Sequence, residues 1–312
     1  MKIIDTILQS PIFLEQPPVL IDIGASGEIN PKWKRIASYS ICLAFDPDTR
    51  EFNITEEKNS GYKKLYKFNR IVSSEPVGST NFYLAKSPFC SSILQPNLDA
   101  LKPWHFHTLF EIDKKIELPA MTIAEALTKC GLTYIDWFKA DTQGTDLRIF
   151  KSLSTAIKES ITAAEFEPGI IDAYKGEDKF YSVLIELEKS GFWVSDLAVK
   201  GTQRINSDKI SLNNFTGRRL LRRSPCWVEI VYLRNPGFVE KRKLLMLYIF
   251  ALLEKQYGFA LEVIEKALSS ENNPLFEQCR NAVLKKIQSE RWKTPLVILK
   301  KQINKLLQYV HD

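Results

Sequence analysis

The 312-residue sequence contains no apolar segment long enough to cross a lipid bilayer. Its longest apolar run, Leu244 to Leu253, has ten residues, whereas a transmembrane helix needs about 20. The N-terminal residues lack the apolar core and small-residue cleavage site of a secretory signal. We therefore expect a cytoplasmic protein without a transmembrane segment.

Cysteine and histidine are also scarce. The five cysteines form no CxxC pair, and there are only three histidines, so the sequence lacks the ligand spacing of a structural zinc site. An odd number of cysteines favours free thiols in a reducing compartment over a disulfide framework.

Charge of one sign is not in large excess. Lys and Arg number 43 and Asp and Glu 37, which gives a formal charge of +6. This mild excess, without interleaved basic and aromatic residues, argues against a nucleic-acid partner. A basic cluster at Arg218 to Arg223 is by default a solvated run, and binding of phosphate or carboxylate groups is the alternative.

Short apolar runs that alternate with helical patterns predict an α/β fold. Runs of this length suit strands buried on both faces of a parallel sheet, and the intervening helices favour a doubly wound arrangement. The last two runs are joined by a polar loop without convincing helical periodicity, which predicts an antiparallel pair at one edge. The expected strands are residues 19–23, 41–45, 64–72, 135–140, 161–166, 192–199 and 226–233, and the expected helices are 122–130, 147–153 and 180–187.

This pattern predicts three regions. Residues 1–18 form an N-terminal helix and lead-in, residues 19–237 the α/β domain, and residues 238–312 a C-terminal helical lobe. The apolar run in this lobe must be buried, either within the chain or in a partner. We therefore expect the lobe to be a candidate surface for a second copy or a protein partner. Its expected helices are 244–253, 258–268, 275–289 and 295–310.

The first expected strand ends in a glycine turn. Gly24 and Gly27 remove side chains at a strand end, which is where open α/β sheets bind ligands. Asp46 ends the second strand, and a carboxylate there can accept both hydroxyls of a ribose. A dinucleotide fingerprint would need glycine at Ser26 and Ile29. S-adenosylmethionine has no pyrophosphate and needs only the close approach and acidic partners, so we favour it; an ordinary strand and turn is the alternative.

Four segments stand out in order along the chain, and the most specific is KADTQGTD at 139–146. Together they resemble the FkbM family of S-adenosylmethionine-dependent methyltransferases, whose signature K-x-D-x-Q-G-x-E has Asp146 in place of the glutamate here. The usual Asp of the last strand is Glu229, and the helical segment from residue 239 lies outside the resemblance. The segments are IDIGASG (21–27) with FDPD (45–48), SSILQPN (91–97), IDWFKADTQGTD (135–146), and EFEP (165–168) with YKG (174–176) and GF (191–192).

The resemblance implies a Rossmann-like class I methyltransferase fold and methyl transfer to a hydroxyl of a sugar, glycan or secondary metabolite. A non-catalytic, cofactor-binding partner in a glycan-assembly system is the alternative, and the helical lobe would then be the working interface. A nucleic-acid methyltransferase is disfavoured by the mild charge. The implied cofactor is S-adenosyl-L-methionine, and its expected site comprises Asp22, Gly24, Ala25, Ser26, Gly27, Asp46, Pro47, Ser73, Ser74, Asp141 and Gln143.

A hydroxyl acceptor must lose its proton, so a base is expected near the strand ends. Asp141 has the best position, and Lys139 would lie on the same side of the strand. Lys139 would orient Asp141 or lower its pKa; a structural salt bridge between the two is the alternative. Glu165 is a further catalytic candidate and Glu167 an acceptor-binding one. With Asp141 they could surround Mg²⁺, but we favour a metal-free, hydrogen-bonded pair.

The remaining candidates for acceptor binding lie between the third and fourth expected strands. Ser91 and Ser92 begin the second resembling segment. His105 and His107 alternate, so a strand would place both imidazoles on one face; a packed surface pair is the alternative. Asp146 lies in the first turn of a helix, where the helix dipole favours a carboxylate; we favour a role as a helix-start residue alone over a role in the site.

Overall fold

The computed structural model describes residues 2–25, 29–48, 61–206, 221–237 and 240–291. The chain divides into two compact units. One unit is Glu15–Asn235, and the other joins Met1–Leu14 to the chain from Pro236 onward. The sequence had set residues 1–18 apart, whereas the structure groups the first helix with the C-terminal helices.

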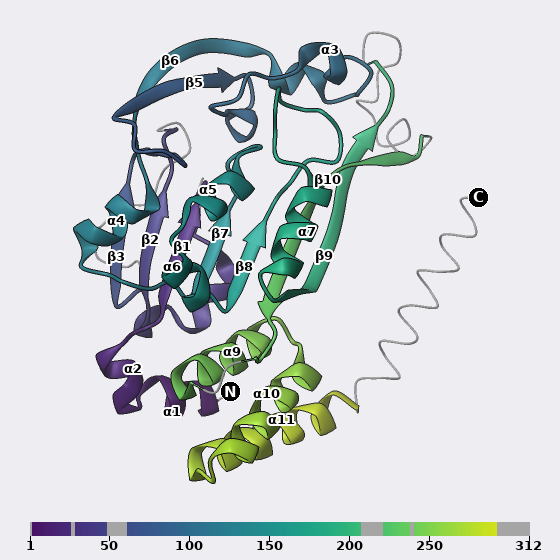
Figure 1. Ribbon diagram of the computed structural model, residues 1–312. Helices are drawn as coiled ribbons and strands as arrows, with labels where there is room; N and C mark the ends of the chain where they lie inside the picture. Colours follow the sequence, from purple (N-terminus) through teal and green to yellow (C-terminus); the bar gives the residue numbers. More distant parts are fainter. Residues whose placement is uncertain (1, 26–28, 49–60, 207–220, 238–239, 292–312) are drawn as a thin grey trace. The chain divides into compact units, whose positions relative to one another are not determined.

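The larger unit is built on a seven-stranded sheet (Figure 1). Its strands are β1 (Val19–Ile23), β2 (Ile41–Phe45), β3 (Lys64–Phe68), β7 (Trp137–Ala140), β8 (Ala163–Phe166), β9 (Phe192–Gln203) and β10 (Arg223–Arg234). The order across the sheet is β3-β2-β1-β7-β8-β10-β9. The first five strands pair in parallel, in the order typical of a doubly wound sheet. Strand β10 runs antiparallel to both β8 and β9. The α/β class, the mostly parallel sheet and the antiparallel pair at its edge are as predicted.

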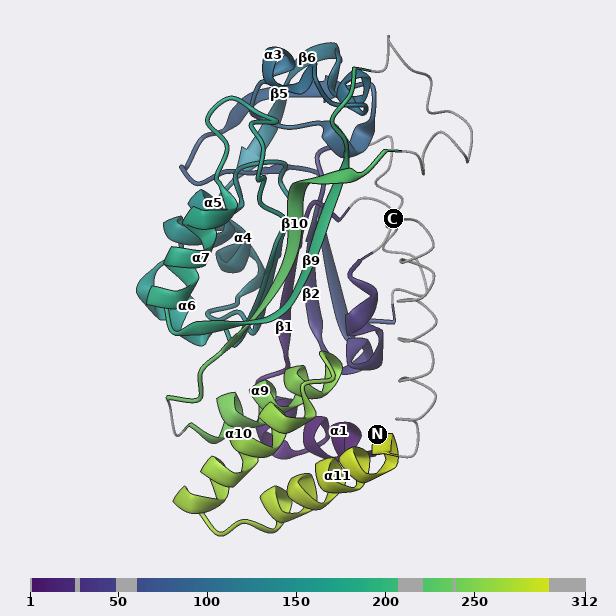
Figure 2. The same cartoon turned by 90° about the vertical axis from the view of Figure 1, so that its right-hand side faces the viewer.

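Four helices cover one face of this sheet (Figure 2): α4 (Ile123–Cys130), α5 (Asp146–Ser152), α6 (Thr155–Ser160) and α7 (Phe180–Lys189). Helix α4 begins with a capping box between Thr122 and Glu125 and ends at Gly131, which has a left-handed backbone. Phe138, Phe150 and Phe166 pack ring against ring between sheet and helices, with centroids 5.7 to 5.8 Å apart. This apolar layer fixes the ends of β7 and β8.

The opposite face of the sheet carries charged side chains within the strands. The strand register places Asp22 beside Lys139 and Lys139 beside Glu165. Trp33, from a short 3₁₀ helix η1 (Pro31–Arg35), is fully buried and packs edge to face on Trp137, with 5.8 Å between the ring centroids. A second 3₁₀ helix, η2 (Ala37–Tyr39), follows it.

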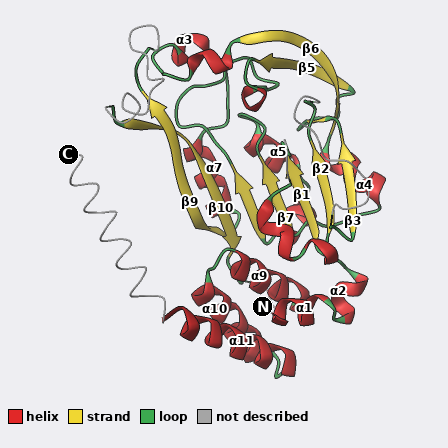
Figure 3. Cartoon of the chain, turned by 180° about the vertical axis from the view of Figure 1, so that it is seen from behind, coloured by secondary structure: helices red, strands yellow, loops and turns green. Residues whose placement is uncertain are grey.

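A second, smaller sheet lies at the end of the main sheet toward which β1, β7 and β8 point (Figures 1 and 3). Its strand order is β4-β6-β5. The apolar run expected at 64–72 is therefore two strands, of which the second leaves the main sheet. The elements here are β4 (Ile71–Val72), β5 (Ser79–Ala85), η3 (Pro88–Cys90), α3 (Leu98–Leu101), η4 (His107–Phe110) and β6 (Ile112–Met121).

The smaller unit is helical. It contains α1 (Lys2–Leu8), α9 (Lys241–Leu253), α10 (Tyr257–Ser270) and α11 (Pro274–Arg291), and α2 (Pro11–Glu15) begins within it. Helix α10 packs against α9 and α11, and Tyr248 donates a hydrogen bond to the carbonyl of Cys279 at 2.8 Å. The apolar run from Leu244 is buried within the chain through Leu252. The helix expected at 295–310 lies outside the described residues.

The described part of the chain includes no helix with the length and hydropathy that a membrane span requires. All five cysteines are free.

Candidate functional site

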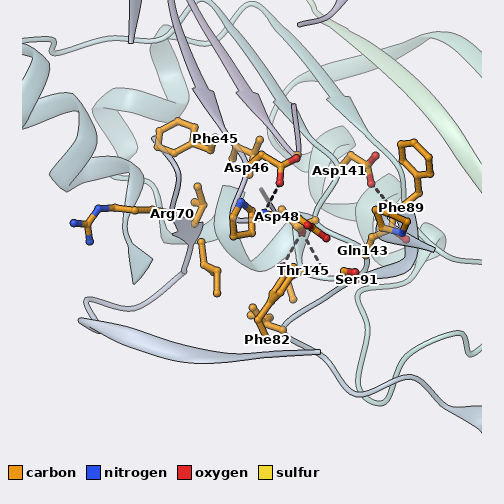
Figure 4. Close-up of a pocket in the computed structure, with 18 residues that line it drawn as sticks. Phe45, Asp46, Asp48, Arg70, Phe82, Phe89, Ser91, Asp141, Gln143 and Thr145 are labelled. Atoms are coloured by element: carbon orange, nitrogen blue, oxygen red, sulfur yellow. Dashed lines mark hydrogen bonds between the residues drawn. The ribbon is translucent and has the colours of Figure 1, made fainter. Parts of the chain in front are cut away.

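The strand order of the main sheet reverses between β1 and β7, and a cleft opens at the carboxyl ends of β1, β2 and β7 (Figure 4). Open α/β sheets bind ligands at such a reversal. The facing wall includes Phe82 of the second sheet, and Phe89 and Ser91 from the segment after β5. The cleft volume is about 80 Å³, below the roughly 300–1,000 Å³ of typical ligand pockets. A nucleoside-sized ligand therefore requires this wall to move outward.

Gly24 allows β1 and β7 to approach each other closely. Its backbone has a φ of +82°, and a Cβ at this position would lie 2.0 Å from the carbonyl oxygen of Asp141. The amides of Gly24 and Ala25 both donate to the carbonyl of Phe45, which ties the turn to β2. Ala25 is buried. Ser26 and Gly27, the other predicted cofactor residues in this turn, lie outside the described residues.

Asp46 lies in the cleft directly after β2. Its carboxylate accepts a hydrogen bond from the amide of Asp48 at 2.7 Å, which Figure 4 shows as a dashed line. Burial in the protein raises the pKa of Asp46 to about 7. Pro47 also lines the cleft. Asp46 therefore presents a carboxyl group with remaining capacity to accept hydrogen bonds from a ligand.

Ser73 and Ser74 were predicted to bind the cofactor, but neither lines the cleft. The hydroxyl of Ser73 donates to the carbonyl of Glu75 at 2.7 Å. The cleft is instead lined by their neighbours Ile71 and Val72.

Asp141 follows β7 and is held in place by Gln143. The side-chain amide Nε2 of Gln143 donates to Asp141 Oδ1 at 2.6 Å, and the hydroxyl of Tyr174 donates to Gln143 Oε1 at 3.0 Å. Gln143 has a φ of +56°, a left-handed conformation that is uncommon for a residue other than glycine and often marks functional sites. Burial raises the pKa of Asp141, and the nearby ammonium group of Lys139 opposes that effect. The chain thus orients a carboxyl group at the centre of the site.

A second cavity, of about 500 Å³, adjoins the cleft on the side of β8 and β10. Asp141, Gln143 and Phe89 line both spaces. The cavity contains four carboxyl side chains, those of Asp141, Glu167, Glu177 and Glu229, and aromatic side chains that include Phe106, Phe110, Tyr174 and Trp227. Its volume falls within the range of small-molecule sites. Most of these aromatic residues were not predicted, because they come from loops and short elements whose sequence carries no periodic signal.

Asp146 links the segments that follow β7 and β8, on which the site is built. Its side chain accepts hydrogen bonds from the amide of Thr142 at 2.8 Å and from the amide of Glu167 at 3.1 Å. Burial raises the pKa of Asp146 to about 7. Ser92 adds a second link, because its hydroxyl donates to the carbonyl of Gln143 at 2.8 Å. Ser91, in contrast, lines the cleft, and its hydroxyl accepts from the amide of Ala85.

Lys139 pairs with Asp22 rather than with Asp141. The ammonium group lies 2.7 Å from Asp22 Oδ1, and the carboxylate of Asp22 is fully buried. Asp22 also accepts from the amide of Asn30 at 2.8 Å. Asp22 lines neither space, although it was predicted to bind the cofactor. Burial lowers the pKa of Lys139, but the negative charges of Asp22, Asp141 and Glu165 together outweigh that effect and raise it.

Glu165 and Glu167 point to different surroundings. Glu165 accepts from Asn30 Nδ2 at 3.0 Å and lies 3.5 Å from the ammonium group of Lys32. It lines neither the cleft nor the cavity, although it was predicted to be catalytic. Glu167, predicted to bind the acceptor, lines the cavity beside Asp141. No group of residues suited to a metal ion occurs in the described ranges.

His105 and His107 do not lie on a strand. The chain turns after α3 and Pro103, and His107 begins η4 with its Nδ1 3.0 Å from the carbonyl of Trp104. Strand alternation therefore does not apply here, and neither imidazole lines the cleft or the cavity. In the basic cluster, Arg218 and Arg219 fall outside the described residues, while Arg223 lines the cavity.

Comparison of the chain with protein-family models, curated proteins and solved structures finds no match.

Proposed function

We propose that the protein is an S-adenosylmethionine-dependent methyltransferase that methylates a hydroxyl group of a sugar, glycan or related metabolite. The observation that carries this proposal is the junction of the cleft and the cavity at Asp141, Gln143 and Phe89. Transfer between two bound molecules requires that they lie side by side in a fixed orientation. The resemblance to FkbM methyltransferases supplies the identity of the cofactor and the class of acceptor.

The residues of the cleft suit the nucleoside part of this cofactor. The carboxyl group of Asp46 accepts only the amide of Asp48 within the described structure, so it can accept the two hydroxyls of a ribose. Gly24 leaves the carboxyl end of β1 free of a side chain. Phe45 and Val72 supply an apolar lining for a base.

When bound, S-adenosylmethionine supplies a methyl group on a sulfonium, which makes the methyl carbon electrophilic. The chain has to place an acceptor oxygen in line with that carbon and take its proton. Orientation of this kind lowers a barrier by about 7–11 kcal/mol. Asp141 is our candidate for the proton acceptor, because it lines both spaces and its carboxyl group is fixed by Gln143. Lys139, paired with Asp22, acts on Asp141 only through its charge.

Calorimetric titration with S-adenosylhomocysteine tests this proposal. We expect micromolar binding by the full chain and weaker binding by Asp46→Ala, by no more than a few kcal/mol. Transfer of a labelled methyl group to a panel of hydroxyl compounds is the second step. No binding by folded protein would refute the proposal, and binding without any transfer would favour the non-catalytic partner.

A further inference from the structure

The side chains that line the second cavity, where the methyl acceptor would bind, offer a ligand many hydrogen-bond acceptors and few donors. Its neutral side chains with donor groups are already engaged within the protein. Gln143 Nε2 donates to Asp141, and the single hydroxyl proton of Tyr174 is shared between Cys90 O at 2.9 Å and Gln143 Oε1 at 3.0 Å. Ser87 hydrogen-bonds to the side chain of Cys90, and Thr202 donates to Gln203. Among the described lining residues, the indole of Trp227 is the exception.

The two lysines beside the cavity are paired with carboxyl groups, whereas the guanidinium of Arg223 is held by a backbone carbonyl and has no carboxylate partner among the described residues. Arg223 Nε donates to the carbonyl of Gly201 at 2.9 Å. Lys179 pairs with Glu177 at 2.6 Å, and Lys200 pairs with Glu229 at 2.9 Å. Two of the four carboxyl groups are therefore matched by lysines.

Glu167 is the carboxyl group in this cavity whose side chain has no hydrogen-bond or ion-pair partner among the described residues. Asp141, Glu229 and Asp146 all raise its pKa by their charge, Lys139 lowers it, and burial is the largest effect, so the pKa is raised to about 9. This environment disfavours the ionised form of Glu167, and a cationic ligand beside it would lower its pKa and favour that form.

The remaining wall is aromatic and suits a cation. Phe106 lies 5.2 Å from Phe110 and 6.3 Å from Trp227 between ring centroids, and Phe110 lies 5.6 Å from Tyr174. Ring faces attract ammonium groups. An ammonium group is also a pure donor, with three N–H groups and no acceptor, which complements a lining that mainly accepts.

We propose that the acceptor carries a protonated amine, which binds at Glu167 against the wall of Phe106, Phe110 and Trp227 and leaves Asp141 to the hydroxyl. This inference rests on the proposed function, since it names the acceptor class of that same site. It predicts weaker binding of acceptors that carry a carboxylate or phosphate at this position, because such a group would meet the carboxyl groups of Glu167 and Asp141 instead of hydrogen-bond donors.

Three ring compounds that differ in one substituent test the proposal. They are trans-4-aminocyclohexanol, cyclohexane-1,4-diol and 4-hydroxycyclohexanecarboxylate, each titrated into the full chain at pH 7.5 with and without S-adenosylhomocysteine. We expect the amine to bind at least tenfold more tightly than the diol, and the carboxylate to bind more weakly than the diol. Equal or tighter binding of the diol or the carboxylate would overturn the proposal.

The variant Glu167→Gln tests whether Glu167 causes the preference for the amine over the diol. We expect it to bring the affinity ratio of amine to diol close to one and to leave S-adenosylhomocysteine binding unchanged, whereas Glu188→Gln, at an exposed position on α7, keeps the ratio of the unmodified protein. Binding of the amine should also release a proton from Glu167, which appears as a dependence of the enthalpy on the buffer and disappears in Glu167→Gln. An unchanged ratio in Glu167→Gln would refute the assignment.

The outcomes separate this proposal from the proposed function. If S-adenosylhomocysteine binds and none of the three ring compounds does, the amine proposal fails and the methyltransferase proposal stands. If the amine is preferred and S-adenosylhomocysteine does not bind, the cavity is assigned correctly and the cofactor is not.

Discussion

Gln143 adopts a backbone conformation that costs about 1–3 kcal/mol for a residue other than glycine. Three hydrogen bonds compensate for it, because its amide donates to Asp141 while its two oxygens accept from Tyr174 and Ser92. All three bonds converge on the turn that carries Asp141. We interpret Gln143 as a positioning residue, whose conformation is maintained by its neighbours and fixes the orientation of the carboxyl group.

Asp141→Asn should abolish turnover without abolishing cofactor binding. An amide cannot accept the proton of a hydroxyl, and loss of a general base lowers a rate by about 10²–10⁴-fold. Labelled-methyl transfer and calorimetric titration with S-adenosylhomocysteine measure the two effects separately. Asp99→Asn, at an exposed position on α3, serves as the control. Turnover retained by Asp141→Asn would exclude Asp141 as the base.

Binding of S-adenosylhomocysteine should strengthen as the pH rises from 6 to 8. The pKa of Asp46 is raised to about 7, so its carboxyl group is mostly protonated at pH 6 and mostly ionised at pH 8. The ionised form is the better hydrogen-bond acceptor for ribose hydroxyls. Titrations at pH 6, 7 and 8 measure the trend, and Asp46→Asn should bind weakly with a flatter dependence. An equal slope in Asp46→Asn would assign the titration to another group.

At the scale of elements, the approach of β1 to β7 depends on one glycine. A Cβ on Gly24 would lie 2.0 Å from Asp141 O, whereas a Cβ on Gly131, at the end of α4, would meet no atom within 4 Å. Both residues have positive φ, of +82° and +66°. The two positions therefore separate strain of the backbone from a steric clash between strands.

Gly24→Ala should destabilise the protein far more than Gly131→Ala. Both changes place a side chain on a left-handed backbone, which costs roughly 1–2 kcal/mol. Only Gly24→Ala also separates two central strands, so we expect its loss of unfolding free energy to be at least twice that of Gly131→Ala. Urea denaturation followed by circular dichroism measures both. Similar losses in the two variants would mean that β1 and β7 adjust freely.

The elements that the sequence predicted well share a strong local signal. Strands β1 and β2 begin and end where their apolar runs do, and α4 ends at its glycine. Strand β6 was missed because its first eight residues are exposed or half-buried without regular alternation, and only its last two are buried. The site residues that follow a strong local signal were also predicted. Asp46 and Asp141 each come directly after an apolar run, so the sequence places them at strand ends. The pairing of Lys139 with Asp22, and the orientation of Glu165 toward Asn30, depend on strand order, which the pattern of a single strand does not contain.

At the scale of the whole molecule, the apolar run of α9 is buried within the chain. Residues Leu244 to Leu252 make up the buried part of this run, so their burial does not require a partner. A second copy or a partner protein bound through these helices remains a prediction.

Buried carboxyl groups should make the larger unit less stable as the pH rises from 5 to 9. The pKa values of Asp46 and Asp146 are raised to about 7 and that of Glu167 to about 9, against roughly 4 for these groups in an unfolded chain. The native state therefore binds more protons than the unfolded state between these values, and its stability falls as the pH rises. Each such group contributes a loss of up to about 1.4 kcal/mol per pH unit.

Urea denaturation at pH 5, 7 and 9 and constant ionic strength measures this slope. Tryptophan fluorescence reports mainly the larger unit, because five of the six tryptophans lie between residues 15 and 235. Between pH 7 and 9 the decline should come mainly from Glu167, so Glu167→Gln, which removes a carboxyl group that has no partner among the described residues, should flatten it. Glu188→Gln should leave the slope unchanged because its side chain is exposed. A stability that rises from pH 5 to 9 would show that these carboxyl groups are ionised in the folded protein, and the protein itself would then already compensate the charge of Glu167.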